Sequence, residues 1–272
     1  MTMADYFNFE EAFDFDPDLL VRVLRGKLAG VIFRQLITPD TCQQIVTNFW
    51  ASSALRKRTD AVPASYVGTF HYGKVLETYL LESESTRKGV GGLFEGTENV
   101  VQKLLGELGE QLKKEGVDLR LAQYQGRSAG AMLVRSWQND GKFSLNPHED
   151  GAQLRTTLQA GFEIEKVAAY SPVAANFCLA NSESGGELHF WNWKPTDDDR
   201  RRLGLLETGY PYPPELLENI DRMVIPIRTG DAYFFNGGNI HAVGTKASSG
   251  SLRLTISFLM GFSDPKTVIY WT

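Results

Sequence analysis

The sequence predicts a mainly β protein in which two sheets face each other, as in a sandwich or double-sheet jelly roll, with helices on the outside. From about residue 118 onward, short apolar segments are separated by Gly, Asn and Pro, as is typical of such sheets. Before that point, two segments carry apolar residues at helical spacing. The chain has 272 residues and no clear linker or internal repeat, so we expect one domain over residues 1–272.

Residues 1–117 are expected to form an N-terminal arm and bracing helices. Residues 5–18 combine acidic side chains with several Phe, which favours an arm packed on the domain over a disordered tail. Thr38, followed by proline, is expected to cap a helix whose inner stripe is Cys42, Ile45, Val46 and Phe49. A second helix should follow Thr97 and end at Gly116, with an inner face of Val101, Leu104, Leu105, Leu108 and Leu112.

Residues 118–272 are expected to form the β core. The strands we predict there are Leu119–Tyr124, Met132–Trp137, Asn176–Asn181, Glu187–Trp193, Met223–Ile227, Ala232–Phe235 and Leu252–Phe262. A polar, Pro-rich insertion near 194–222 interrupts them, with one short helix expected after Thr196 and another after Pro214. Within it, Asp197–Asp199 directly precedes Arg200–Arg202, which favours a solvated helix surface whose charges compensate one another.

Composition excludes several classes of partner. The net charge is −5 and no long basic run occurs, which argues against nucleic acid as a partner. No apolar run approaches the roughly 18 residues of a membrane span, and the N-terminus lacks the pattern of a secretory signal. Cys42 is predicted on a helix and Cys178 in a strand, so both are expected to be buried free thiols. These features fit a cytosolic protein that acts on a small molecule.

His148, Asp150 and His241 are the candidate metal ligands. Two imidazoles and one carboxylate hold a non-haem Fe(II) on one face and leave the opposite face open. On an extended segment His148 and Asp150 would leave from the same side, while Glu149 between them points away. His241 must then come from a strand that is distant in sequence and adjacent in space. Any one of the three alone would more often be a surface polar group.

Around these residues the chain resembles the Fe(II)/2-oxoglutarate-dependent oxygenases. Phe177–Phe190 looks like the family's strand, Gly-Gly-Glu turn and returning strand, and Gly230–Asn236 like the Gly-Asp turn and strand before the distal histidine. Phe235–Gly238 and the C-terminal Ile269–Trp271 resemble the small free-standing members that halogenate or hydroxylate amino acids and alkaloids. The resemblance covers roughly residues 28–272. It implies a double-stranded β-helix core.

The resemblance also implies the chemistry. Fe(II), 2-oxoglutarate and O₂ would be the cofactors, and 2-oxoglutarate would be decarboxylated to succinate while hydrogen is abstracted from an unactivated C–H bond of the substrate. The halogenases replace the metal carboxylate with Gly or Ala, which frees a coordination position for chloride. Here that position is Asp150, so the resemblance implies hydroxylation rather than chlorination.

Arg253 and Thr255 match the family's R-x-S/T pair, which binds the far carboxylate of 2-oxoglutarate. The planar guanidinium of Arg253 suits a bidentate carboxylate, and the Thr255 hydroxyl would share its face of the strand. An arginine in this otherwise apolar strand would be expensive to bury without an anion. A structural salt bridge between Arg253 and an internal acid is the alternative.

The remaining candidates concern the substrate. His71 lies in a Gly- and aromatic-rich stretch of the kind that forms lids, so it is treated as substrate-facing. Arg135 and Trp137 share a strand face and are candidates for the wall of the pocket, and Arg155 is a candidate anchor for an acidic substrate; both arginines are more often surface groups. His189, on a strand with two Trp on its face, is expected to be packed and hydrogen-bonded.

The leading hypothesis is hydroxylation of a free or N-modified amino acid, with a natural-product intermediate second. Desaturation and cyclisation begin with the same hydrogen abstraction and stay open. A cupin-like metal dioxygenase or isomerase without 2-oxoglutarate is the alternative enzyme, since Pro226–Asp231 would suit a cupin, although a cupin usually has an H-x-H pair. A metal-binding or scaffold protein on the same fold is the alternative that is not an enzyme.

Overall fold

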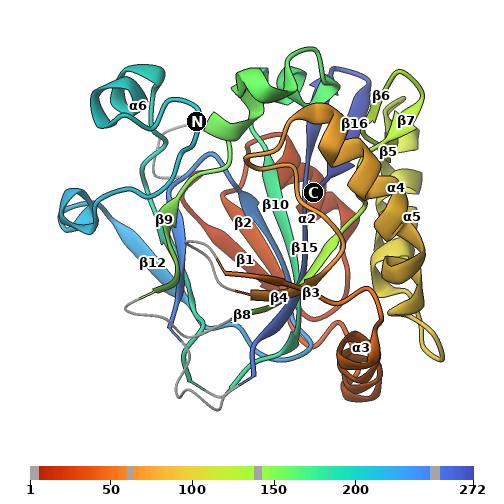
Figure 1. Cartoon of the computed structure of the whole chain (residues 1–272). Helices are drawn as coiled ribbons and strands as arrows, with labels where there is room; N and C mark the ends of the chain where they lie inside the picture. The colour runs from red at the N-terminus through yellow and green to blue at the C-terminus, as the bar shows by residue number, and fades with distance from the viewer. Residues whose placement is uncertain (1–5, 60–63, 138–142, 183, 246–251) are drawn as a thin grey trace.

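Two β-sheets face each other, and helices cover the outer side of the larger one (Figure 1). The computed structural model describes residues 6–59, 64–137, 143–182, 184–245 and 252–272. The large sheet has, in spatial order, β1 (Phe9–Ala12), β2 (Gly30–Phe33), β13 (Ala232–Asn236), β10 (Val173–Ala180), β15 (Leu254–Asp264), β8 (Leu133–Trp137), β4 (Ala64–Val67) and β3 (Arg56–Arg58). β16 (Thr267–Trp271) pairs with the far end of β15 and with β5 (Asp118–Leu121).

The small sheet carries the strands on which two metal candidates lie. Its spatial order is β12 (Arg222–Ile225), β11 (Leu188–Trp191), β14 (His241–Gly244) and β9 (Phe143–His148). A two-stranded ribbon of β6 (Gln123–Tyr124) and β7 (Arg127–Ser128) lies apart from both sheets. β9 and β14 were not among the predicted strands, although a strand position for His241 was expected.

The two faces of the large sheet are sorted by the period-2 alternation of its strands. In β10, Ala175 and Phe177 pack toward the helices, whereas Ala174 and Cys178 pack between the sheets. β15 follows the same rule, with Leu254, Ile256, Phe258, Met260 and Phe262 in the helix-facing core. Arg253 and Thr255 alternate with these residues, so their side chains belong to the inner face, toward the small sheet.

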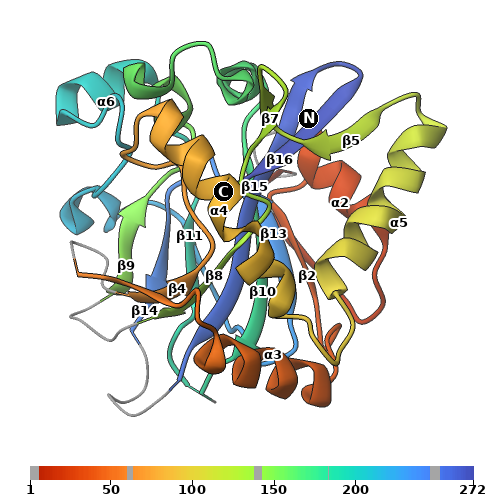
Figure 2. The same ribbon diagram turned by 45° about the vertical axis from the view of Figure 1, so that its right-hand side comes forward.

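Helices α2 (Pro17–Leu24), α3 (Pro39–Ala51) and α5 (Val100–Lys114) cover the outer face of the large sheet (Figure 2). α3 is capped by Thr38 as predicted, and its predicted inner stripe is buried. α5 follows Thr97 and ends near Gly116 as predicted, and Asn99 is its N-cap. No helix of the described residues is long and apolar enough to cross a membrane.

Helices α2 and α4 (Leu76–Gly92) were not predicted. The sequence of α4 contains three Gly, two Ser and two Thr, which are weak helix formers, and its apolar stripe is short. Tertiary packing compensates, because Tyr79 and Leu80 join a core cluster with Phe162 and Trp271. α2 begins inside the acidic segment that was predicted as an arm, where Asp16 caps it.

The polar insertion contains the short helix predicted after Thr196, α6 (Asp197–Leu203), and Thr196 caps it in a capping box with Asp199. After Pro213 the chain forms only a 3₁₀ turn, η4 (Pro214–Leu217), rather than an α-helix. Three further 3₁₀ turns, η1 (Ala152–Arg155), η2 (Thr157–Gln159) and η3 (Glu163–Ala169), follow the metal candidates and connect them to β10.

Candidate active site

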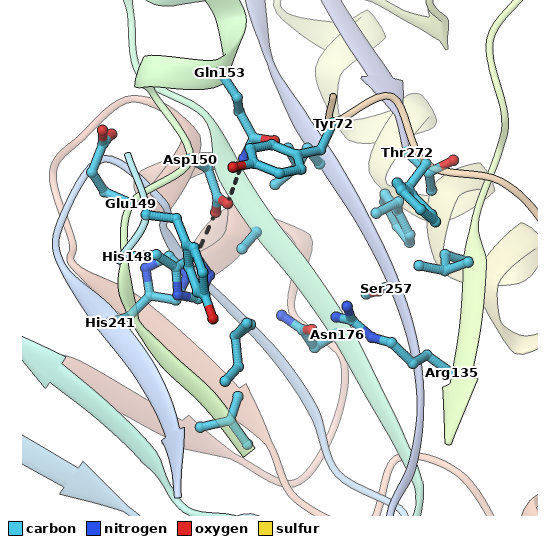
Figure 3. A pocket seen from close by; sticks show the side chains of 18 of the residues that line it. Tyr72, Arg135, His148, Glu149, Asp150, Gln153, Asn176, His241, Ser257 and Thr272 are labelled. Atoms are coloured by element: carbon cyan, nitrogen blue, oxygen red, sulfur yellow. Dashed lines mark hydrogen bonds and ion pairs between the residues drawn. The ribbon is translucent and has the colours of Figure 1, made fainter. Parts of the chain in front are cut away.

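The three predicted metal ligands meet at one edge of the small sheet. His148 ends β9 and His241 begins β14, and these two residues face each other directly in the register of the strand pair. Asp150 lies in the turn after β9, where its N–H donates to the carbonyl of Gly237 at 2.7 Å. One ligand atom from each of the three residues lies within 4.8 Å of the others. Residues distant in sequence thus form one possible metal site (Figure 3).

Hydrogen bonds fix the orientation of each ligand. Nδ1 of His148 donates to the carbonyl of Asn146 at 2.8 Å, and Nδ1 of His241 donates to the carbonyl of Asn239 at 2.9 Å. Since a carbonyl only accepts, both rings carry their proton on Nδ1 and present the Nε2 lone pair to a metal. Asp150 is held by Gln153, whose amide donates to Oδ1 at 2.9 Å.

The protonation states favour a bound cation. Burial lowers the pKa of His241 to about 4 and the pKa of His148 well below its usual value, so both imidazoles are neutral near pH 7. Burial also raises the pKa of the Asp150 carboxyl to about 7. A divalent cation among these atoms would stabilise the carboxylate form and use both lone pairs. A donor set of two nitrogens and one oxygen fits Fe(II).

Close approach of the backbone explains the glycine in the Asn236-Gly237-Gly238 motif. A Cβ added at Gly237 would lie 2.5 Å from Oδ2 of Asp150, which is shorter than any tolerable contact. Any other residue there would displace the carboxylate or the backbone that anchors it. This motif therefore shapes the metal site directly.

Glu149 points away from the side chains of His148 and Asp150, as expected for the middle residue of the triplet (Figure 3). Both of its carboxylate oxygens accept hydrogen bonds at 3.0 Å from Arg200 of α6, and the pair is buried. The carboxylate also accepts from the N–H groups of Gly151 and Ala152. The prediction that Arg200–Arg202 is a solvated surface is therefore wrong for Arg200, because this side chain turns inward to neutralise a buried acid.

A cavity of about 370 Å³ opens beside the three ligands. Its walls come from both sheets, from the loop after β4 and from the polar insertion. Residues lining it include Phe70, His71, Tyr72, Leu133, Arg135, Trp137, Leu145, Asn176, Leu188, Thr208, Tyr210, Tyr233, Phe235, Val243, Ser257, Leu259 and Thr272. Most of these side chains are apolar or aromatic with a few polar groups, as in pockets that bind small molecules.

Arg253 is buried behind the wall formed by Trp137 and Tyr233. Its Nη2 donates to the Tyr233 hydroxyl at 3.3 Å, and its guanidinium lies 5.1 Å from the Trp137 ring centre. Nε and Nη1 of Arg253 have no hydrogen-bond partner among the described residues, and no described carboxylate pairs with it. The alternative of a structural salt bridge thus finds no partner there. Thr255 accepts a hydrogen bond from Nε1 of Trp137 at 2.8 Å, which leaves its own hydroxyl proton available.

Arg135 is a second arginine beside Trp137, and it lines the pocket. Its guanidinium stacks 3.8 Å from the Trp137 ring centre and extends to the side of the pocket where Asn176 and Ser257 lie (Figure 3). No hydrogen bond or ion pair joins Arg135 to another residue in the described part of the chain, and its Nε is fully buried. Burial, with repulsion from Arg58 and Arg253, lowers the pKa of Arg135 to about 9. It remains a cation near pH 7 and lacks an anion.

The other predicted candidates separate into two groups. His71 lines the pocket, as expected for a substrate-facing residue. The structure does not bring Arg155 to the pocket, because its guanidinium is half-exposed and pairs with Asp197 on α6. His189 stacks on Trp191 with ring centres 6.0 Å apart, in line with a packed role.

Several residues that line the pocket were not predicted from the sequence. Asn176 is polar in the otherwise apolar strand β10, and Ser257 lies two residues beyond Thr255 on the same face of β15. Both could have been found by extending the alternation of these strands. Tyr72, Gln153 and Tyr210 lie in loops or turns, where periodicity carries no signal.

Comparison with known proteins identifies the family. The profile of the carrier-protein-independent halogenase WelO5 matches residues 7–272. The chain belongs to this family. An L-isoleucine 3(1)-dioxygenase from Pantoea ananatis is 30% identical over 250 residues, which cover 89% of this chain and 82% of that enzyme. The structure of an N-substituted L-amino acid dioxygenase from Burkholderia ambifaria matches with a TM-score of 0.61 at 12% identity, over 94% of this chain and 91% of that one.

These relatives confirm the predicted enzyme class and fold class. The enzyme is a 2-oxoglutarate-dependent non-haem iron dioxygenase, with Fe(II), 2-oxoglutarate and O₂ as its cofactors. The likeness to the Burkholderia ambifaria structure confirms a jelly-roll core, although the two sheets do not close on each other here. The family profile is named for a halogenase, yet this chain carries a carboxylate, Asp150, within the group of candidate ligands.

Proposed function

We propose that this enzyme hydroxylates an aliphatic C–H bond of an amino acid, either free or N-modified. The observation that carries the proposal is Arg135, a cation with no carboxylate partner among the described residues, in the wall of a pocket that opens on the three candidate ligands. A partly buried guanidinium without an anion is unfavourable, and an amino acid supplies a carboxylate that matches its planar fork. The Pantoea ananatis relative acts on such a substrate.

His148, Asp150 and His241 would hold the iron, and Arg253 with Thr255 would bind the far carboxylate of 2-oxoglutarate. The free Nε and Nη1 of Arg253 and the free proton of Thr255 are donors that fit this group. Together with 2-oxoglutarate and O₂, the iron supplies the oxidising power to remove hydrogen from an unactivated carbon. The protein positions that carbon and excludes water from it.

The apolar part of the pocket would receive the substrate side chain. Leu133, Leu145, Phe235, Val243 and Leu259 line it and offer no polar group. A cavity of about 370 Å³ is at the small end of the usual range for ligand pockets, about 300–1,000 Å³. Its size suits a single amino acid beside 2-oxoglutarate rather than a peptide. Desaturation or cyclisation would begin with the same hydrogen removal and would use the same residues.

Two coarser expectations about the setting are part of this proposal. The charge of −5 and the absence of a long basic run support a small-molecule substrate rather than nucleic acid. Cys42 and Cys178 are buried and unpaired, which supports a reducing compartment, and we propose the cytoplasm.

The test is formation of succinate from 2-oxoglutarate with Fe(II), in the presence of single amino acids and their N-acyl derivatives. Stimulation by one of them, with an added oxygen atom in the product by mass spectrometry, is expected. Arg135→Met should raise KM for that amino acid and leave 2-oxoglutarate affinity unchanged. Arg155→Met is the matched control, since Arg155 lies outside the pocket and should be neutral. If Arg135→Met weakens 2-oxoglutarate instead, Arg135 serves the co-substrate.

A further inference from the structure

His71 is a buried imidazole in the pocket wall that the metal site does not use. It lies in the loop after β4, between the pocket residues Phe70 and Tyr72, and is 2% exposed. Tyr79 and Trp271 contact its ring edge to face, with centres 6.2 and 6.5 Å away. The ring is therefore fixed in place.

The hydrogen bonds of Gln159 determine which nitrogen of His71 carries the proton. The Gln159 amide nitrogen donates to the carbonyls of His71 at 2.7 Å and Lys74 at 3.0 Å, so its oxygen must face the imidazole. That oxygen lies 3.1 Å from Nδ1 of His71. Because an amide oxygen only accepts, Nδ1 carries the proton and Nε2 presents a lone pair.

Nε2 of His71 has no partner among the described residues. The nearby ammonium of Lys74 is already engaged by Glu82 and by the Thr69 hydroxyl. Burial lowers the pKa of His71 to about 4, so the ring stays neutral near pH 7 and Nε2 remains an acceptor. This buried acceptor without a donor is the counterpart of Nε of Arg135, which is a buried donor without an acceptor among the described residues.

We propose that Nε2 of His71 accepts a hydrogen bond from the α-ammonium group of the substrate, whose carboxylate is bound by Arg135. This assignment rests on the proposed function and requires that the substrate is a free amino acid, because an N-acyl derivative has no ammonium group. His71 would then be a specificity-determining residue that distinguishes an amino acid from a simple carboxylic acid.

The charges in the pocket favour a neutral acceptor for the ammonium. Glu149 and Asp150 are the residues with side-chain carboxylates among the described lining residues. Glu149 is neutralised by Arg200, and Asp150 belongs to the metal group. Neither is available for the substrate, so the ammonium needs an uncharged acceptor. The tautomer of His71 supplies one that cannot act as a donor at Nε2.

Two variants separate this role from a structural one. In His71→Asn, the shorter amide nitrogen can replace Nδ1 as donor to Gln159, but the acceptor at Nε2 is lost. In His71→Gln, the longer side chain can return an acceptor near the position of Nε2. Binding is measured by calorimetry in the Ni(II)- and 2-oxoglutarate-loaded protein, which does not turn over. The probes are the best amino acid from the succinate screen and its deamino analogue, which keeps the carboxylate and side chain.

Wild type should bind the amino acid at least about tenfold more tightly than the deamino analogue. His71→Asn should remove most of that preference by weakening the amino acid alone, and His71→Gln should restore part of it. Equal weakening of both probes, or no change in either, would overturn the role of His71 and leave the proposed function standing. Binding of N-acyl amino acids alone would also overturn only the role of His71, whereas failure of wild type to bind any amino acid, free or N-acylated, would overturn both.

Discussion

At the scale of single residues, we propose that position 150 determines which oxidation the iron can support. Asp150 is one of three side chains whose ligand atoms converge, and its carboxylate is held in place by Gln153 and by the close approach of Gly237. In the proposed site, an anionic oxygen in that place would occupy the coordination position that a halide needs. The chain belongs to a family named for a halogenase, and we propose that this carboxylate favours hydroxylation over halogenation.

We expect wild type, given its substrate, to form a hydroxylated or dehydrogenated product even in abundant chloride. Asp150→Gly should bind iron more weakly but admit chloride or bromide, with low activity that is partly uncoupled from substrate oxidation. Mass spectrometry of the products, with and without halide, makes the comparison. Chlorination by wild type would show that Asp150 is not the third ligand.

The proposed role of Arg253 in binding 2-oxoglutarate can be tested by one substitution. Arg253→Lys keeps the charge and loses the planar fork, so 2-oxoglutarate affinity should fall while iron binding stays nearly intact. Removing a charged hydrogen-bonded partner costs roughly 2–5 kcal/mol, or about one to four orders of magnitude in affinity. Titration of the anaerobic Fe(II) protein, followed by its visible charge-transfer band, gives the dissociation constant. An unchanged value would assign the co-substrate to Arg135.

At the scale of elements, the insertion near residues 194–222 contacts the turn after β9 that carries Asp150. Arg200 on α6 neutralises Glu149, which lies between two candidate ligands, and the Gly209 carbonyl accepts from the Glu149 N–H at 3.0 Å. A Cβ at Gly209 would lie 2.5 Å from the Glu149 carbonyl oxygen, and its positive φ of 59° also favours glycine. The next residue, Tyr210, lines the pocket with its ring 6.1 Å from that of His148. The insertion therefore forms part of the pocket wall and is not only a surface loop.

Arg200→Met should therefore destabilise the protein, because it leaves Glu149 buried without a cation. Breaking a buried pair from one side typically costs about 3–5 kcal/mol. Arg201→Met is the matched control: Arg201 is on the same helix, forms an exposed pair with Asp198 and should change stability by less than about 0.5 kcal/mol. Urea unfolding of the metal-free proteins measures both. Equal midpoints for the two variants would show that the pair does not anchor the insertion.

At the scale of the whole molecule, one continuous core joins the helices to the large sheet. The helix-facing cluster contains residues from α2, α3 and α5 together with β2, β10, β13 and β15. The expectation of a single domain follows from this continuity. Far-ultraviolet circular dichroism and tryptophan fluorescence should therefore report one coincident unfolding transition. Two separated transitions would mean that residues 1–117 fold apart from the rest.

Metal binding should stabilise this unit, because the ligands converge only in the folded chain. A cation that binds the native state alone adds about 2.7 kcal/mol at a free concentration one hundred times its Kd. Thermal melting with Fe(II) under anaerobic conditions, and again after chelation, should show a higher Tm in the metal-bound protein. His148→Ala and His241→Ala should abolish the difference. Persistence of the wild-type increase in either variant would identify a wrong ligand.

The sequence by itself determined the chemistry of the site and the elements with strong local signals. The His148-Glu149-Asp150 triplet, the arginine two residues before Thr255, and the capped helix after Thr38 are all local features of the chain, whereas His241 meets His148 only through the pairing of β14 with β9. Helix α4 could not be predicted from the sequence, because its formation depends on packing of Tyr79 and Leu80 against a core assembled from distant segments. Local propensity is weak where tertiary contacts supply the stabilisation.

Only the tertiary structure decided which role each charged residue has. Arg135, Arg155 and Arg200 look alike in the sequence, as arginines near the metal motif. In the part of the folded chain that the structure describes, Arg135 lies in the pocket without a carboxylate partner, Arg155 is a surface partner of Asp197, and Arg200 neutralises Glu149. The tautomer of His71 likewise depends on Gln159, far along the chain. Burial and partners set the role of each charge, and both arise only when the two sheets and the insertion come together.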